Sequence, residues 1–310
     1  MSSKILALTK LDKKFIKKKS FYLADYACEF ENYEDRSKEI VKFTRTHKLR
    51  RKDNLYLLKL KKKILLSLTS FLNNSINKNY SLKFWTTILN TWVTKYIVLI
   101  HYKWIFVENI SKKKKFKIIK LNFDEKIIKT RNFLEWSDLS ETDCYNRKII
   151  QDIILSSFSK KFHFINCKKK INCNYKIKTN INLMPRISIK GIIIKSIKKL
   201  INLFSINNKF LFFDTNFTAR SNFLLNLKLK QLPFFFVNDL FNTKISKNNI
   251  TQFKDKELTL KKKNMFECFL AKQILNDIPL SYTSNFVENY NKMKKIKINT
   301  KYFFSSGIYM

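Results

Sequence analysis

Three residues combine a reactive side chain with a position suited to acid–base chemistry or ligand contact: His101, Asp214 and Asp25. His101 lies in a tryptophan-rich stretch, and an imidazole can accept or donate a proton near neutral pH. The same position also suits a histidine packed at the edge of a core. Asp214 and Asp25 each end an apolar run that predicts a strand, where an acid can contact a ligand or cap the next helix. These three are candidate ligand-contacting residues, and the sequence identifies no catalytic residue.

Other reactive side chains predict no metal or cofactor site. Cys167 and Cys173 flank a lysine run close to His163, but the spacing is not that of a zinc finger and no second ligand pair follows. With 2 glycines the chain cannot build a glycine-rich phosphate loop. The acidic residues of 29–39 lack an apolar frame, which favours a solvated loop.

Cysteine usage and the N-terminus bear on location. The 5 cysteines are odd in number and widely spaced, and no sustained apolar segment follows the first residues. We therefore expect free thiols in a reducing compartment, and a cytoplasmic protein that can contact the inner face of the membrane.

The element that must position His101 is a predicted helix over residues 80–109. Ser81 can cap it, and its apolar residues recur in steps of three and four. That stripe consists of Trp85, Leu89, Trp92, Tyr96 and Leu99. Large aromatic rings at helical spacing predict a core element. Lys95, His101 and Lys103 interrupt the segment, which argues against a membrane span.

A second helix is predicted to precede it and to complete a helical hairpin over residues 53–109. Asp53 is its expected N-cap, and its buried face is expected to be Leu57, Leu60, Ile64, Leu68 and Phe71. Strands are predicted at 4–11, 21–28, 116–123, 209–214, 232–237 and 300–306. Helices are predicted at 141–154, 187–204, 217–230, 265–275 and 283–293, and a Lys/Asn-rich exposed loop at 159–182. The strand–helix–strand pattern of 209–237 predicts parallel pairing and an α/β fold.

Composition leaves two functional classes open. The 310 residues are 45% hydrophobic, which suffices for a sizeable core, and carry a formal net charge of +40. Only eight of the 63 basic residues are arginine, although arginine forms the better bidentate contact with phosphate. A lysine-rich, glycine-poor composition is typical of AT-rich genomes. The charge therefore has two explanations: mutational drift that placed lysines on the surface of a globular enzyme, or a lysine-rich RNA-binding or ribosomal-type protein. Non-specific nucleic acid binding is expected in both cases.

Four blocks carry a resemblance to a known family. They are SFYLADYACEF (20–30), NYSLKFWTTILNTWVTKYIVLIHYKW (79–104), FLFFDTNFTARSNFLLNLKLKQLPFFF (210–236), and the segment from IPLSYTSNFVENYNKMKK to YFFSSG (278–307). With them the chain resembles the transferases first described in leptospiral genomes and found in bacterial surface-carbohydrate gene clusters. Asn90 and Thr91 depart from the family pattern, which has Gly-Pro there, and the chain ends before the family's Gln-His-Gly-Gly-type segment.

The resemblance implies a Rossmann-like parallel sheet with a helical hairpin insertion, as the first domain of a glycosyltransferase-B-like architecture. Residues 1–295 would form the acceptor-type domain and 296–310 the start of a truncated second domain. The implied function is glycosyl transfer in surface polysaccharide biosynthesis, with a nucleotide-sugar donor and a carbohydrate or lipid-linked acceptor. Because the donor half would be missing, we expect this chain alone to be inactive.

Overall fold

The computed structural model describes residues 5–16, 22–24, 40–41, 45–113, 116–123, 129–171, 201, 209–213, 219–232, 253, 256–294 and 301–305. The chain forms two compact units. Unit 1 comprises residues 1–177 and 245–283, and unit 2 comprises residues 178–244 and 284–310. This division of contacts differs from the predicted boundary between residues 295 and 296, which stays a prediction.

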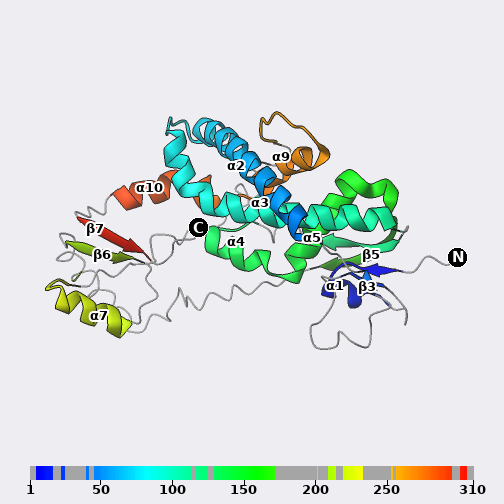
Figure 1. Ribbon diagram of the computed structural model, residues 1–310, viewed down its shortest axis with the longest axis horizontal. Coiled ribbons are helices and arrows are strands. Elements are labelled where there is room, and N and C mark those ends of the chain that lie inside the picture. The colour runs from blue at the N-terminus through cyan, green and yellow to red at the C-terminus, as the bar shows by residue number, and fades with distance from the viewer. Residues whose placement is uncertain are drawn as a thin grey trace. The chain divides into compact units, whose positions relative to one another are not determined.

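Two long helices that pack against each other dominate unit 1 (Figure 1): α2 (His47–Ile76) and α3 (Leu82–Lys113). Both predicted helices are confirmed. The expected N-cap of α2 is wrong, because the N-cap is Thr46, seven residues earlier, whose hydroxyl accepts a hydrogen bond from the Leu49 N–H. Asp53 lies inside the helix and pairs with Arg45. Ser81 caps α3 as predicted, accepting from the Phe84 N–H at 3.2 Å.

The aromatic stripe of α3 forms the core of unit 1, as its spacing predicts. Trp85, Trp92 and Tyr96 are fully buried. Trp92 stacks on Tyr96 with ring centroids 5.1 Å apart and meets Trp136 edge-on at 6.2 Å. Phe71, an expected core residue of α2, is only half-buried. Within the described ranges, no helix combines the length and the apolar character needed to cross a bilayer.

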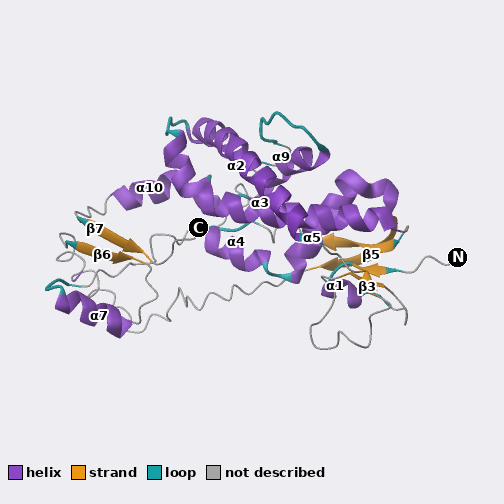
Figure 2. Ribbon diagram, in the orientation of Figure 1, coloured by secondary structure: helices purple, strands orange, loops and turns teal. Residues whose placement is uncertain are grey.

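The strands of unit 1 pair in parallel, consistent with an α/β fold (Figure 2). The short strands β1 (Leu6–Ala7), β2 (Tyr22–Ala24) and β3 (Ile40–Val41) form one sheet in that order. Strands β4 (Lys117–Phe123) and β5 (His163–Ile171) form another. β1 is shorter than predicted because helix α1 (Lys10–Lys13) begins within the expected strand.

Strand β5 contradicts the predicted loop over residues 163–171. Most of its side chains are exposed, so its sequence lacks the alternation that marks a half-buried strand. The backbone hydrogen bonds to β4 form regardless of that polarity. Residues 159–161 form a 3₁₀ turn, and residues 172–182 of the predicted loop lie outside the described part of the chain.

Helices α4 (Phe133–Ser140) and α5 (Asp143–Ile153) follow β4, and α5 continues into a π-helical turn, Ile154–Phe158. The helix predicted at 141–154 is α5, whereas α4 was not predicted. The side chain of Gln151 ties α5 to β4, accepting from the Leu121 N–H at 2.8 Å and donating to its carbonyl at 2.9 Å. Helix α9 (Met265–Asp277) completes unit 1, where Asp277 accepts a hydrogen bond from the Tyr96 hydroxyl of α3 at 2.8 Å.

Unit 2 contains a parallel pair, β6 (Phe210–Phe213) and β7 (Tyr302–Ser305), with helices α7 (Ala219–Lys228) and α10 (Phe286–Lys294). All four elements were predicted, although the partner expected for β6 was the segment 232–237. Residues 233–237 of that strand lie outside the described residues, and so does the helix predicted at 187–204 apart from residue 201. The β6–β7 pairing brings together strands that are far apart in the sequence.

The cysteines follow the sequence prediction only in part. Cys167 and Cys268 are free. Cys144 is disulfide-bonded, so the expectation of free thiols is wrong at this position. Cys173, the second cysteine considered as a zinc ligand, lies outside the described residues.

Candidate functional site

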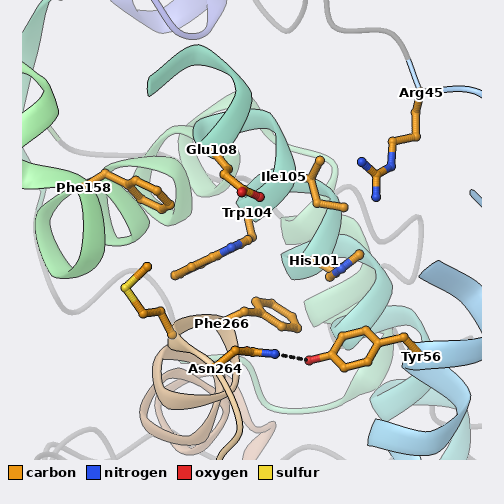
Figure 3. A pocket seen from close by; sticks show the side chains of 10 residues that line it. Arg45, Tyr56, His101, Trp104, Ile105, Glu108, Phe158, Asn264 and Phe266 are labelled. Carbon is orange, nitrogen blue, oxygen red and sulfur yellow. Dashed lines mark hydrogen bonds between the residues drawn. The ribbon is translucent and has the colours of Figure 1, made fainter. Parts of the chain in front are cut away.

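A cavity of about 330 Å³ opens in unit 1 between α2, α3, the N-terminus of α9 and the π-helical turn (Figure 3). Its volume lies near the lower end of the range for small-molecule sites. Aromatic rings and a few polar groups line it. The structure places His101 in this cavity, whereas Asp25 and Asp214 lie outside the described residues.

Helix α3 supplies one wall. His101, Trp104, Ile105 and Glu108 follow one another at spacings of three, one and three residues, which places them on one face of the helix. At about 100° per residue this face lies on the other side of α3 from the core stripe of Trp85, Trp92 and Tyr96. One helix therefore carries both the core stripe and this wall of the cavity.

The imidazole of His101 is 9% exposed and lies between two rings. Its centroid is 5.0 Å from that of Phe266, edge-on, and 5.8 Å from that of Tyr56. Burial lowers its pKa from the ordinary value, because an imidazolium is poorly solvated there. Asp53 and Glu108 oppose this shift and Arg45 adds to it, but burial has the largest effect. His101 is therefore a neutral imidazole at neutral pH, which can accept a proton.

Tyr56 of α2 lies beside His101 and is hydrogen-bonded to residues at the start of α9. The Tyr56 hydroxyl donates to Glu267 Oε1 at 3.0 Å and accepts from Asn264 Nδ2 at 3.2 Å (Figure 3). The side-chain oxygen of Asn264 caps α9 by accepting from the Glu267 N–H at 2.9 Å, which fixes the amide. Burial, with a contribution from Glu267, raises the pKa of Tyr56 to about 12. Tyr56 is thus a neutral hydroxyl whose position is set by two helices.

Charged side chains of both signs stand at the cavity. Arg45 binds Asp53 through two hydrogen bonds of 2.6 and 2.7 Å, and this pairing raises the pKa of the guanidinium. Glu108 pairs with Lys112 at 2.7 Å and keeps 39% of its side chain exposed. A ligand therefore meets a carboxylate and a guanidinium whose positions are already restrained.

The apolar side of the cavity is aromatic. Trp104 is 6% exposed, and its ring lies 5.1 Å from that of Phe158 and 5.6 Å from that of Phe266. Such rings offer flat apolar faces, and the carboxylate, hydroxyl and amide groups offer hydrogen bonds. A ligand with both apolar and hydrogen-bonding surface could contact both kinds of group, and a neutral imidazole can accept a proton.

Sequence reasoning missed most of the residues around His101. Glu108 lies seven residues after His101, so the helical spacing could have identified it. Tyr56 and Asn264 are 208 residues apart in the chain, and nothing in either local sequence connects them. Arg45 precedes the predicted start of α2, so it was not considered as part of that helix.

Comparison with known proteins gives one match. A family profile described as LIC12162 family transferase matches residues 4–310. No curated protein and no solved structure matches the chain.

Proposed function

Because the chain belongs to the LIC12162 family of transferases, we propose that it transfers a glycosyl group from a nucleotide-sugar to a carbohydrate or lipid-linked acceptor in surface polysaccharide biosynthesis. Membership of a transferase family also favours this class of function over RNA binding. The parallel pairing of the described strands supports a Rossmann-like, glycosyltransferase-B-like architecture with an acceptor-type domain. Asp25 and Asp214 follow β2 and β6, and we propose that they contact ligand at those strand ends.

We assign the acceptor to the cavity of unit 1. The observation that carries this assignment is a neutral histidine enclosed by aromatic rings and restrained polar groups. Trp104 and Phe266 would stack on the C–H face of a sugar ring, and Glu108 and Asn264 would bond its hydroxyls. Binding there would orient one hydroxyl toward His101.

In the proposed step the acceptor oxygen attacks the anomeric carbon of the donor. The new C–O bond forms as the bond from the anomeric carbon to the phosphate oxygen breaks, and the leaving nucleoside diphosphate keeps that electron pair. His101 takes the proton of the acceptor hydroxyl. General base catalysis of this kind contributes typically about 10²–10⁴-fold in rate.

The test is an activity screen with the purified full chain, which also tests the expectation that this chain alone is inactive. Nucleoside diphosphate release is measured for a panel of nucleotide-sugars, each with and without free and lipid-linked oligosaccharides. For a pair that reacts, His101→Gln is expected to lower kcat by about 10²–10⁴-fold with a much smaller change in KM. His163→Gln, at an exposed histidine of β5, is the matched control and should leave kcat unchanged.

Two results would contradict the proposal in separate ways. A His101→Gln variant with unchanged kcat would show that another group is the base. Acceptor binding, measured by isothermal titration calorimetry, that is unaffected by Trp104→Leu and Glu108→Gln would place the acceptor elsewhere.

A further inference from the structure

The outward-facing surface of α2 carries exposed leucines, where a solvent-facing helix surface usually carries polar side chains. Leu55, Leu58 and Leu66 are 57%, 52% and 57% exposed. At about 100° per residue these positions fall within one sector of the helix, opposite the buried Leu60 and Ile64. Leucines gathered on one exposed face, unlike scattered ones, indicate an interaction surface.

Basic side chains share this sector with the leucines. They are exposed and comprise Lys48, Arg51, Lys52, Lys59 and Lys62. Asp53 is the acidic residue of the α2 sequence, and it is paired with Arg45 on the other side of the helix. We call the five basic residues together with Leu55, Leu58 and Leu66 the outer face of α2. At 1.5 Å per residue it extends over about 27 Å.

We propose that the outer face of α2 docks the protein on an anionic lipid bilayer. The leucines would enter the boundary between headgroups and acyl chains, and the basic side chains would reach the lipid phosphates. Each lysine or arginine near an anionic leaflet strengthens binding by a similar increment, and among the described residues no carboxylate forms an ion pair with the five of this face. Charge complementarity and exposed apolar side chains therefore point to the same partner.

The same residues fit a nucleic acid less well. Proteins that bind single strands use aromatic platforms and arginine to stack on bases, whereas this face has leucines and one arginine. Exposed leucines gain nothing from a phosphate backbone, but they are the groups that insert into a bilayer. Binding of RNA would depend on the lysines and not on the leucines. Lysine and leucine variants therefore distinguish RNA from a bilayer as the partner.

Docking would also orient the candidate site. Tyr56, which lines the cavity, is adjacent in α2 to Leu55 of the outer face. A bilayer at this face would bring the cavity close to lipid-linked molecules. That consequence rests on the proposed function, whereas the docking itself does not.

The test is co-sedimentation of the full chain with vesicles made of equal parts phosphatidylcholine and phosphatidylglycerol, compared with phosphatidylcholine alone. We expect binding to the anionic vesicles that weakens with added salt. Lys59→Gln/Lys62→Gln should lose about fivefold in affinity per residue, or roughly 25-fold together. Leu55→Ser/Leu58→Ser should lose about tenfold or more, because each leucine has half of its surface available to insert.

Matched control variants show whether vesicle binding depends on this face or on the charge and apolar character of the whole surface. Lys168→Gln/Lys169→Gln removes the same charge from exposed positions of β5, and Val98→Ser/Leu134→Ser removes exposed apolar side chains elsewhere in unit 1. Both should bind vesicles like the parent chain. All substitutions are at exposed positions, and circular dichroism verifies that the variants fold.

Three results would overturn the inference. Equal loss in the face variants and the matched controls would mean non-specific adhesion. Parent-like vesicle binding by Leu55→Ser/Leu58→Ser would exclude insertion of the leucines. Binding to single-stranded RNA that depends on Lys59 and Lys62, with vesicle binding unchanged in both face variants, would assign the face to nucleic acid.

Discussion

Replacing Arg147 with methionine should destabilise unit 1 more than any surface substitution. Arg147 of α5 is fully buried and binds both carboxylate oxygens of Asp12 through Nε, at 2.8 and 2.9 Å. Its other nitrogens donate to the Ile119 carbonyl of β4 and, at 3.4 Å, to Gln151. Asp12 in turn accepts from the Leu8 and Thr9 N–H groups. One guanidinium therefore joins α1, β4 and α5.

The magnitude follows from what Arg147→Met leaves behind. Asp12 is 1% exposed, so its charge stays buried, and of its described hydrogen-bond partners the Leu8 and Thr9 N–H groups remain. Removing one partner of a buried ion pair costs about 3–5 kcal/mol. Asp12→Asn in the same chain removes the orphaned charge and keeps an oxygen for those N–H groups. The double variant should then lose only about 1–2 kcal/mol, the cost of the unpaired Ile119 carbonyl.

Urea denaturation followed by tryptophan fluorescence measures this directly. All 4 tryptophans, Trp85, Trp92, Trp104 and Trp136, belong to unit 1, so the signal reports that unit alone. Arg50→Met, at an exposed arginine of α2, is the control and should change the free energy of unfolding by no more than about 0.5 kcal/mol. If Arg147→Met stays within about 1 kcal/mol of the parent chain, or if Asp12→Asn destabilises it further, the pair does not act as a buried ion pair.

Two further predictions concern the hairpin and the candidate site. Asn73 accepts from Trp85 Nε1 at 2.8 Å and brackets the backbone of Tyr80, so Asn73→Ala should cost about 1–3 kcal/mol in urea denaturation, with Asn74→Ala as the neighbouring control. Because burial lowers the pKa of His101 below the ordinary 6.5, the unfolded chain binds more protons between the two values. The free energy of unfolding should therefore fall as pH drops through this window, and His101→Gln should reduce that slope. An unchanged slope in His101→Gln would contradict the burial effect.

The elements that sequence predicted well are those whose pattern repeats over many residues. In α3, large apolar residues recur every three or four positions over about four turns, from Trp85 to Leu99, and Ser81 lies where a cap is needed. The short strands β6 and β7 were recognised because each contains a run of apolar residues. In these cases local sequence and tertiary packing favour the same structure.

The errors come from elements that long-range contacts stabilise. β5 carries lysines on its exposed face, and only its pairing with β4 identifies it as a strand. Thr46 and Asp53 are both good N-cap residues, but Asp53 is engaged by Arg45, and α2 extends back to Thr46. The parallel pairing of β6 with β7 joins segments about ninety residues apart, which no local pattern specifies.

The candidate site shows the same division between local and long-range information. The sequence identified His101 as a residue that could be either a base or a packed core histidine, and the structure shows features of both. It is buried against Phe266 and Tyr56, and that burial is the cause of its lowered pKa. Packing and proton acceptance are therefore not alternatives at this position, since the aromatic contacts keep the imidazole neutral and leave it facing a cavity. The residues that make it a site, Tyr56 and Asn264, are brought there by the packing of α2 and α9 on α3, so the fold had to be known before the histidine could be interpreted.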